Sequence, residues 1–202
     1  MLSEIAFNII FVGDHASGKT SIIQRYCKNL FPVDYSPSLE PELSSGIRIC
    51  GYVRDGIEYN LPVRFQIWDT PGLCEHRQMV RNHLGKMNCY IIVCDVSDPH
   101  ALHSLQSWWD DIVQTGGAQA LTLVVGNKID VDRRTLSYGE ISETVRSVTG
   151  RAYMEVSARN NEGISDLFTV IGDQLLKQFP SLVESHHEEK YDLEETCFCS
   201  IQ

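Results

Sequence analysis

Apolar runs and amphipathic stretches follow one another along the chain. The run at residues 5–13 is apolar and ends in a glycine, and a helical pattern follows it. Uninterrupted apolar runs are typical of strands buried on both faces of a parallel sheet, and they occupy residues 5–13, 88–97 and 120–128. Residues 46–70 are predicted to form two strands around the Asp55-Gly56 turn, and residues 152–157 a short last strand.

Helical periodicity appears between these strands. Residues 19–30 follow the first apolar run, residues 138–150 end in a glycine, and residues 162–179 precede Pro180. Another helix is marked by a single apolar stripe, which we assign to Leu102, Leu105, Trp109 and Ile112. In this interpretation Trp109 belongs to the core.

The alternation of strands and helices predicts the fold class. An α/β domain of three layers, with a mostly parallel sheet between helices, satisfies it. We place this domain at residues 1–180. Residues 181–202 are polar and acidic, and we expect them to form a disordered tail.

Composition and charge argue against some classes of function. The 202 residues are 43% apolar, enough for one substantial core, and no apolar run is long enough to cross a membrane. The net charge of −10 argues against binding nucleic acid, which requires clustered Lys and Arg. About half of this charge lies in residues 181–202, which hold six acidic residues and one Lys.

The seven cysteines do not form a disulfide or zinc pattern. The chain has no Cys-x-x-Cys pair and no cleavable apolar leader, so we expect reduced thiols and a cytoplasmic setting. Five of the cysteines fall in predicted core elements: Cys27, Cys50, Cys74, Cys89 and Cys94.

Residues 13–20, GDHASGKT, match the phosphate-binding pattern G-x-x-x-x-G-K-[ST], and they lie between a predicted strand and a predicted helix. The backbone N–H groups of such a loop and the following helix N-terminus attract phosphate. Lys19 would reach the outer phosphates, and the Thr20 hydroxyl would bind Mg²⁺. A glycine-rich turn that merely caps a helix is the alternative, and the strand–loop–helix context argues against it. The predicted loop contacts are His15, Ala16, Ser17, Gly18, Lys19, Thr20 and Ser21.

A second motif selects the base. In NKID, residues 127–130, the Asp130 carboxylate can accept hydrogen bonds from the N1–H and amino groups of guanine, whereas adenine has no donor at N1. Asn127 can tie this loop to the phosphate loop, and the Lys128 stem can cover the ring. Within SAR, formed by Ser157, Ala158 and Arg159, the Ala158 N–H is placed to meet the guanine carbonyl.

Together these motifs resemble the Ras superfamily of small GTPases over residues 1–180. The resemblance implies a P-loop G domain, with a six-stranded, mostly parallel sheet flanked by about five helices, and GTP, GDP and Mg²⁺ as ligands. It also implies roles in the switch regions. Phe31 would stack on guanine, and Tyr35 would lie near the phosphates. Ser38 and Asp69 would help to hold Mg²⁺, and the Gly72 N–H would sense the γ-phosphate.

Within the superfamily the chain looks most like the Rab proteins. RFQIWDT, IIVCDVSD, VVGNKID and VSARNNEGISDLF carry this likeness, and the insert that marks Rho proteins is absent. FPVDYSP is closer to the Rho pattern, however, and the segment from Ser38 to Asp69 is several residues longer than usual. A Rho-like or Ras-like signalling GTPase therefore stays open as an alternative.

Two positions near the γ-phosphate depart from the family pattern. Leu73 stands where the family has the Gln that orients the attacking water, and His15 replaces a small residue. Leu cannot hydrogen-bond water, and His15 would crowd an arginine finger. A hundredfold loss of rate corresponds to about 2.7 kcal/mol. We therefore expect an enzyme with slow intrinsic GTP hydrolysis and name no certain catalytic residue. The alternative is a binding module that stays loaded with GTP.

Trp68 and the two terminal cysteines suggest contacts outside the pocket. Trp68 alternates with Ile67 on a strand, so we place it on the polar face as a candidate effector contact. The end of the chain, CSIQ, fits a prenylation signal at Cys199, usually for farnesyl. Cys197 is a candidate for a second prenyl group or a palmitoyl group, because the acidic tail cannot supply basic residues for membrane binding. An ordinary terminal pair of cysteines is the alternative.

The leading hypothesis is a monomeric GTPase switch that regulates vesicle and membrane traffic. We expect a guanine nucleotide exchange factor, a GTPase-activating protein, a prenyl-binding chaperone and effectors as partners, and no nucleic acid. Prenylation would hold the chain at the cytoplasmic face of a membrane. A P-loop kinase or ATPase conflicts with NKID.

Overall fold

The computed structural model describes residues 5–32, 39–54, 56–85 and 87–184, and the account of the structure is limited to them. The strands are β1 (Ile5–Gly13), β2 (Glu42–Arg54), β3 (Ile57–Asp69), β4 (Cys89–Asp95), β5 (Leu121–Asn127) and β6 (Ala152–Glu155). The α-helices are α1 (Lys19–Lys28), α2 (Arg77–His83), α3 (Ala101–Gln114), α4 (Tyr138–Thr149) and α5 (Ile164–Gln178). Two 3₁₀ turns, η1 (Cys74–His76) and η2 (Gly117–Gln119), complete the described elements.

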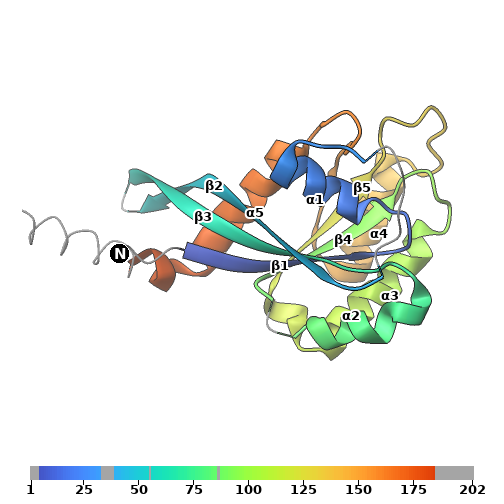
Figure 1. The fold of residues 1–202 in the computed structure, drawn as a ribbon, viewed down its shortest axis with the longest axis horizontal. Helices are drawn as coiled ribbons and strands as arrows, with labels where there is room; N and C mark the ends of the chain where they lie inside the picture. Colours follow the sequence, from blue (N-terminus) through green and yellow to red (C-terminus); the bar gives the residue numbers. More distant parts are fainter. Residues whose placement is uncertain (1–4, 33–38, 55, 86, 185–202) are drawn as a thin grey trace, which may run out of the picture.

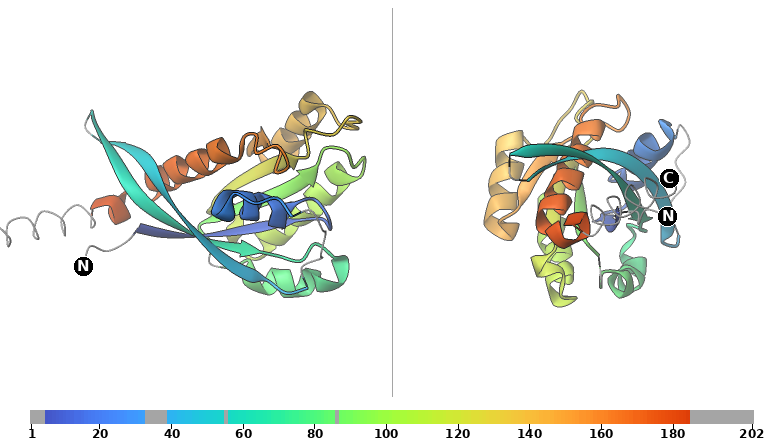
Figure 2. Two further views of the ribbon diagram at one scale, coloured as in Figure 1. Left: turned by 45° about the horizontal axis from the view of Figure 1, so that its top comes forward. Right: turned by 90° about the vertical axis from the view of Figure 1, so that its left-hand side faces the viewer.

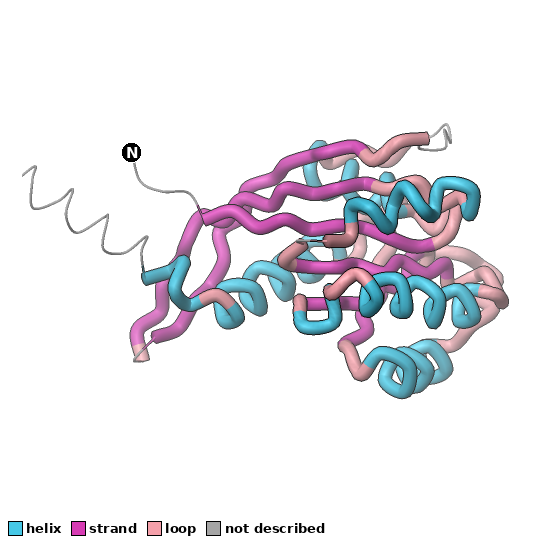
Figure 3. The backbone as a smooth tube through the Cα atoms, turned by 90° about the horizontal axis from the view of Figure 1, so that it is seen from below, coloured by secondary structure: helices cyan, strands magenta, loops and turns pink. Residues whose placement is uncertain are grey.

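The strands form one sheet in the order β2-β3-β1-β4-β5-β6. β2 and β3 are antiparallel, whereas β1 pairs in parallel with both β3 and β4, and β5 and β6 continue the parallel arrangement. Figure 1 shows the sheet between its helices, and Figure 3 shows the strands side by side. The predicted three-layer α/β fold with a mostly parallel, six-stranded sheet is confirmed.

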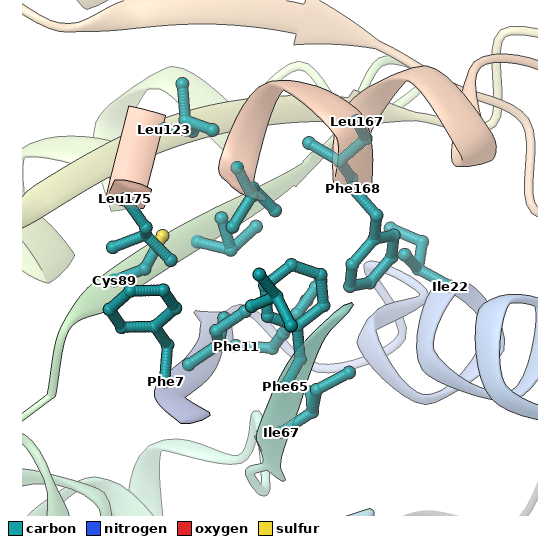
Figure 4. Packing of buried hydrophobic residues seen from close by; sticks show 14 of the residues in the cluster. Phe7, Phe11, Ile22, Phe65, Ile67, Cys89, Leu123, Leu167, Phe168 and Leu175 are labelled. Atoms are coloured by element: carbon teal, nitrogen blue, oxygen red, sulfur yellow. The ribbon is translucent and has the colours of Figure 1, made fainter. Parts of the chain in front are cut away.

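Alternation along β1 divides the core in two. Phe7, Ile9 and Phe11 face a cluster that is covered by α1 and α5, while Ile10 and Val12 face a cluster that is covered by α2, α3 and α4. Figure 4 shows the first cluster, in which Phe65 of β3 and Phe168 of α5 meet across the layers, 6.0 Å between ring centroids. Burial on both faces explains why the parallel strands are continuously apolar.

The boundaries of three elements differ from the prediction. β2 begins at Glu42, four residues before the predicted start, and the added residues pair with the part of β3 that lies beside β1. The turn end of the β2–β3 hairpin reaches beyond β1, whose first described residue pairs with Val63 (Figure 2). α2 was not among the helices predicted from the sequence. Helical structure also resumes at Pro180, and Val183, which is 1% exposed, belongs to the first core cluster, so packing extends past residue 180.

The buried tryptophan of α3 is Trp108, not Trp109. Trp108 is 2% exposed, and the buried stripe runs through Ala101, Leu105 and Ile112. Trp109 is partly buried, with the Arg151 guanidinium 5.5 Å from its ring centroid. Adjacent tryptophans both fit a helical stripe, and only the docking angle of the helix distinguishes them.

Four of the five predicted core cysteines have described side chains, and all four are free thiols. Cys50, Cys89 and Cys94 are buried, while Cys27 is partly buried. Burial raises the pKa of Cys50 to about 11 and that of Cys94 to about 12, so these thiols stay protonated near neutral pH. Among the described helices, none combines the length and the apolar character that a membrane span requires.

Candidate nucleotide site

The segments that follow the carboxyl ends of β1, β3, β5 and β6 meet around one cavity. Its volume is about 480 Å³, within the range of small-molecule pockets. The cavity is lined by His15, Ala16, Gly18, Lys19, Thr20, Ser21, Gln24, Phe31, Pro32, Thr70, Gly72, Asn127, Lys128, Asp130, Val131, Ala158 and Arg159. Thirteen of these are residues singled out in the sequence. Gln24, Pro32, Thr70 and Val131 were missed.

The phosphate loop has a backbone that few sequences permit. Ala16 and Gly18 have positive φ angles of 58° and 95°, and α1 begins directly after Gly18. A Cβ atom on Gly18 would lie 2.1 Å from Asn127 Nδ2, so a side chain there would displace Asn127. Ser17 lies behind the loop, 2% exposed, and its Oγ has no hydrogen-bond partner. The phosphate loop is thus closely packed against Asn127, the last residue of β5.

Lys19 is buried under the loop. Its Nζ donates to the carbonyl oxygens of Gly13 and Asp14, both at 2.9 Å. Burial lowers the pKa of Lys19 to about 8, and the nearby carboxylates of Asp69 and Asp14 partly offset this shift. A phosphate group in the cavity would supply the negative charge that favours the ammonium form.

Thr20 and Asp69 come together at the phosphate end. Thr20 Oγ1 donates to Asp69 Oδ2 at 2.6 Å. Asp69 is 4% exposed, and its other oxygen, Oδ1, is buried without a partner. Burial raises the pKa of this carboxyl group, while the Thr20 hydrogen bond and the Lys19 charge oppose the rise. A hydroxyl, a carboxylate with a spare buried oxygen and nearby phosphates are ligands that Mg²⁺ accepts.

The described residues contain no cluster of three His, Cys, Asp or Glu side chains that would bind a metal without phosphates. Ser38, the third predicted Mg²⁺ ligand, and Tyr35 lie outside the described residues. Of the three predicted Mg²⁺ ligands, Thr20 and Asp69 are therefore the two that the described residues include.

The base end of the cavity is held by hydrogen bonds between loops. Asn127 Nδ2 donates to the Ser17 carbonyl at 2.9 Å, which ties NKID to the phosphate loop as predicted. Ser157 Oγ donates to Asp130 Oδ1 at 2.5 Å and orients the carboxylate, a role that the sequence did not reveal. Arg25 of α1 supports the same region by donating to the carbonyls of Ala158 and Arg159.

Two details at this end differ from expectation. The Ala158 N–H, predicted to meet the guanine carbonyl, donates to Asn127 Oδ1 at 3.2 Å. The Lys128 ammonium pairs with Asp95 Oδ2 at 2.5 Å, while Lys128 itself lines the cavity with a positive φ of 69°. Asp95 was missed, although a carboxylate at the end of an apolar strand is the signal that marks it.

The start of the second switch lies against the phosphate loop. A Cβ atom on Gly72 would lie 2.5 Å from the backbone of Asp14 and His15, so only glycine fits here. His15 lines the cavity and is exposed. Leu73 is partly buried and does not line the cavity, and its carbonyl accepts the His76 N–H at 3.0 Å.

A cluster beside the cavity links the phosphate loop to α2 and α3. Trp108 Nε1 donates to Asp14 Oδ1 at 2.9 Å, and the Arg77 guanidinium lies 4.4 Å from the Trp108 ring centroid. Arg77 Nε also donates to Asp111 Oδ2 at 2.6 Å. The first residue of α2 is thereby connected to the residue next to His15.

Trp68, the candidate effector contact, is less accessible than predicted. The alternation of β3 is confirmed, with Ile67 buried and Trp68 on the other face. The indole is partly buried, because it packs against the second core cluster and lies 5.6 Å from the His83 ring of α2. The more exposed apolar side chains nearby belong to β2, beginning with Leu43, which pairs with Trp68.

Comparisons with known proteins agree with one another. The model of the Ras family matches residues 8–177. Ras-related protein RabC of Dictyostelium discoideum is 28% identical over 172 residues, which cover 85% of this chain and 84% of that protein. Ras-related protein Rab-7b of Mus musculus is 29% identical over 186 residues, with 91% and 89% covered. GTP-binding protein YPT52 of Saccharomyces cerevisiae is 26% identical over 194 residues, with 85% and 82% covered.

Proposed function

Because the chain belongs to the Ras family, as the match over residues 8–177 shows, we propose that it is a Rab-type switch. It exchanges GDP for GTP, recruits effectors in the GTP state, and hydrolyses GTP slowly when unassisted. The observation that carries this proposal is a single cavity with two chemically different ends. Lys19 and Thr20 stand at the phosphate end, and Asp130 stands at the base end.

The chain's own groups divide the work of binding. The loop N–H groups and the Lys19 ammonium neutralise the phosphate charge, and the α1 N-terminus adds its dipole. Thr20 and Asp69 would hold Mg²⁺, which when bound neutralises charge on the β- and γ-phosphates. Asp130, oriented by Ser157, accepts from the two donors of guanine. Phe31, at the rim and 37% exposed, is available to cover the base.

We expect slow hydrolysis because of two residues in the segments that meet at the phosphate end, one of which, Leu73, does not line the cavity. Leu73 has no group that can orient water, and His15 occupies space beside Gly72. Positioning and electrostatic stabilisation are nearly all that a protein contributes to phosphoryl transfer. An activating protein that supplies both Arg and Gln would restore turnover. The same two residues support a second candidate function, a module that stays bound to GTP.

Guanine recognition is tested by Asp130→Asn, with Asp132→Asn as the control. Asp132 is exposed, lies two residues away and does not line the cavity. The new amide presents a donor to the guanine amino group, so GTP affinity should fall by about 10³-fold or more. Xanthosine triphosphate, which has a carbonyl at that position, should bind the variant better than the parent. Titration with fluorescent nucleotides measures both, and an unchanged preference for GTP over ATP contradicts the proposal.

Single-turnover hydrolysis distinguishes the switch from the GTP-bound module. We expect slow conversion of bound GTP to GDP, accelerated by a Rab-type activating protein. A chain that holds GTP unchanged in both conditions would be the binding module. Proteins retained by the GTP-loaded form but not by the GDP-loaded form would separate a role in membrane traffic from Rho-like or Ras-like signalling.

The tail supports a role at membranes. Cys199 begins CSIQ, and Cys197 precedes it by two residues; both lie outside the described residues. We propose that Cys199 is prenylated, that Cys197 carries a second lipid, and that a prenyl-binding chaperone solubilises the modified chain. Intact-mass measurement of protein isolated from its own cells should show the added lipid. An unmodified C-terminus, or a chain that continues beyond Gln202, would contradict the anchor.

A further inference from the structure

β2 is an open edge of the sheet. It pairs with β3 from Glu42 opposite Asp69 to Arg54 opposite Ile57, and within the described residues no strand lies on its other side. Long edge strands expose unpaired N–H and C=O groups, and proteins commonly protect them with Lys, Pro or a short length. Residues 42–54 span 13 positions without Lys or Pro. β2 therefore lacks these forms of protection.

One face of β2 carries a row of exposed apolar side chains. Leu43, Ile47, Ile49 and Val53 are 54%, 56%, 59% and 65% exposed. The intervening positions face α5, where Cys50 is buried in the first core cluster. Side chains alternate between the faces of a strand, so the four apolar residues share the face away from α5. We call these four residues the β2 ladder.

The β2 ladder is symmetric about Arg48. Residue numbers of facing positions have a constant sum in an antiparallel pair, so a second β2 centred on Arg48 would place Leu43 opposite Val53 and Ile47 opposite Ile49. Every ladder residue then meets an apolar residue. A two-fold interface requires a surface that is complementary to itself in this way.

The remaining positions agree with the same register. Ser45 would face Gly51, so the small residues meet each other. Arg48 would face its own copy, but its guanidinium already donates to Ser165 Oγ and Thr169 Oγ1 of α5, on the other face from the β2 ladder.

Backbone hydrogen bonding also favours this pairing. The Gly51 N–H does not point toward β3; it donates to Asp173 Oδ1 of α5 at 3.1 Å. Because backbone groups alternate along an edge strand, the N–H and C=O groups of the β2 ladder point to the same open side. In a second β2 the facing residues would be bonded pairs. Asp173 would retain the Gly51 N–H, which removes one inter-strand bond from each Ser45–Gly51 pair.

We propose that two copies of this chain associate through antiparallel β2 strands, around a two-fold axis at Arg48, and join their sheets into one. The monomer expected from the sequence would then be the dilute form. The interface includes Leu43, which neighbours Trp68 on the same face. Self-association and any partner that binds near Trp68 would therefore compete.

Sedimentation equilibrium of the full-length, GDP-loaded chain under reducing conditions tests this proposal. We expect a reversible monomer–dimer equilibrium. Ile47→Arg enters the interface twice and should weaken the dimer by about tenfold or more. Ile57→Arg is the matched control. Ile57 is also 56% exposed, but it belongs to β3 and lies outside the β2 ladder, so this variant should dimerise like the parent.

Amide hydrogen exchange identifies the mode of contact. Exchange of the outward N–H groups of Ile47, Ile49 and Val53 should slow as protein concentration rises, while the Gly51 N–H should change little. A chain that remains monomeric up to about 1 mM overturns the proposal. So does a dimer that Ile57→Arg weakens as much as Ile47→Arg, or one that leaves β2 exchange unchanged, because its interface lies elsewhere.

Discussion

The two ends of the nucleotide cavity are built differently. At the base end, each selective group is held by another part of the chain: Asp130 by Ser157, and Asn127 by the Ser17 carbonyl. At the γ-phosphate end, Gly72 packs against the backbone of Asp14 and His15, and the residue after it is Leu73, which does not line the cavity. Hydrogen bonds within the chain orient the polar groups at the base end, whereas Leu73 offers no polar side-chain group at the other end.

Because of this difference, nucleotide affinity and the rate of GTP hydrolysis depend on different groups. Preorganised polar groups bind without paying for their own ordering. Hydrolysis needs an additional water to be positioned, which neither Leu73 nor a backbone contact achieves. Tight binding and slow hydrolysis are therefore compatible within one pocket. Three experiments test how independent the two properties are.

The largest effect should come from the buried ammonium group at the phosphate end. Lys19→Ala removes the ammonium from the phosphates and should weaken GTP and GDP binding by about 10³-fold, ~4 kcal/mol. Thr20→Asn should impair Mg²⁺-dependent loading by removing the hydroxyl that now contacts Asp69. Calorimetry with Lys28→Ala, an exposed lysine of the same helix, provides the control. Unchanged affinity in both site variants would place the phosphates elsewhere.

An intermediate effect is expected at the γ-phosphate end. Leu73→Gln supplies an amide for the water and should raise the single-turnover rate of hydrolysis by up to about a hundredfold, ~2.7 kcal/mol. Nucleotide affinity should change little. Adding His15→Gly should increase the rate further and by more than the product of the separate effects, because both act on one water. A rate that Leu73→Gln leaves unchanged in both backgrounds would mean that another residue limits hydrolysis; exposed Glu75 is the nearest candidate.

The smallest effect should come from the support of the base end. Ser157→Ala removes the hydroxyl that orients Asp130, and GTP affinity should fall by about tenfold, ~1.4 kcal/mol. The hydrolysis rate of bound GTP should stay the same. Ser147→Ala, on the exposed side of α4, is the control. A change in hydrolysis rate without a change in affinity would show that the two ends are coupled.

Sequence reasoning succeeded where chemistry depends on adjacent residues. Lys19 and Thr20 sit in one loop, and Asn127 and Asp130 in another, so each motif carries its own geometry. The parallel strands could be predicted just as readily, because burial on both faces makes them continuously apolar. The order of these segments was enough to predict that both loops meet at one end of the sheet.

Contacts between segments that are distant along the chain could not be predicted from the sequence in the same way. Ser157 orients Asp130 from 27 positions along the chain, and Asp95 pairs with Lys128 from 33 positions away. Neither distance produces a local pattern. Trp108 and Trp109 show the same limit, since their spacing fits two helix orientations equally well. The β2 ladder is different: three of its four residues lay within the predicted strand and only Leu43 lay outside it, but the sequence did not show that this face of β2 is left uncovered.

The position of Trp108 should make its intrinsic fluorescence sensitive to nucleotide exchange. Its indole lies between the Arg77 guanidinium of α2 and the Asp14 carboxylate of the phosphate loop. Indole emission shifts in wavelength and intensity when nearby charges move. Nucleotide exchange that displaces α2 from the loop would therefore be recorded in the intrinsic fluorescence of an unlabelled chain, with Trp108→Phe as the blank.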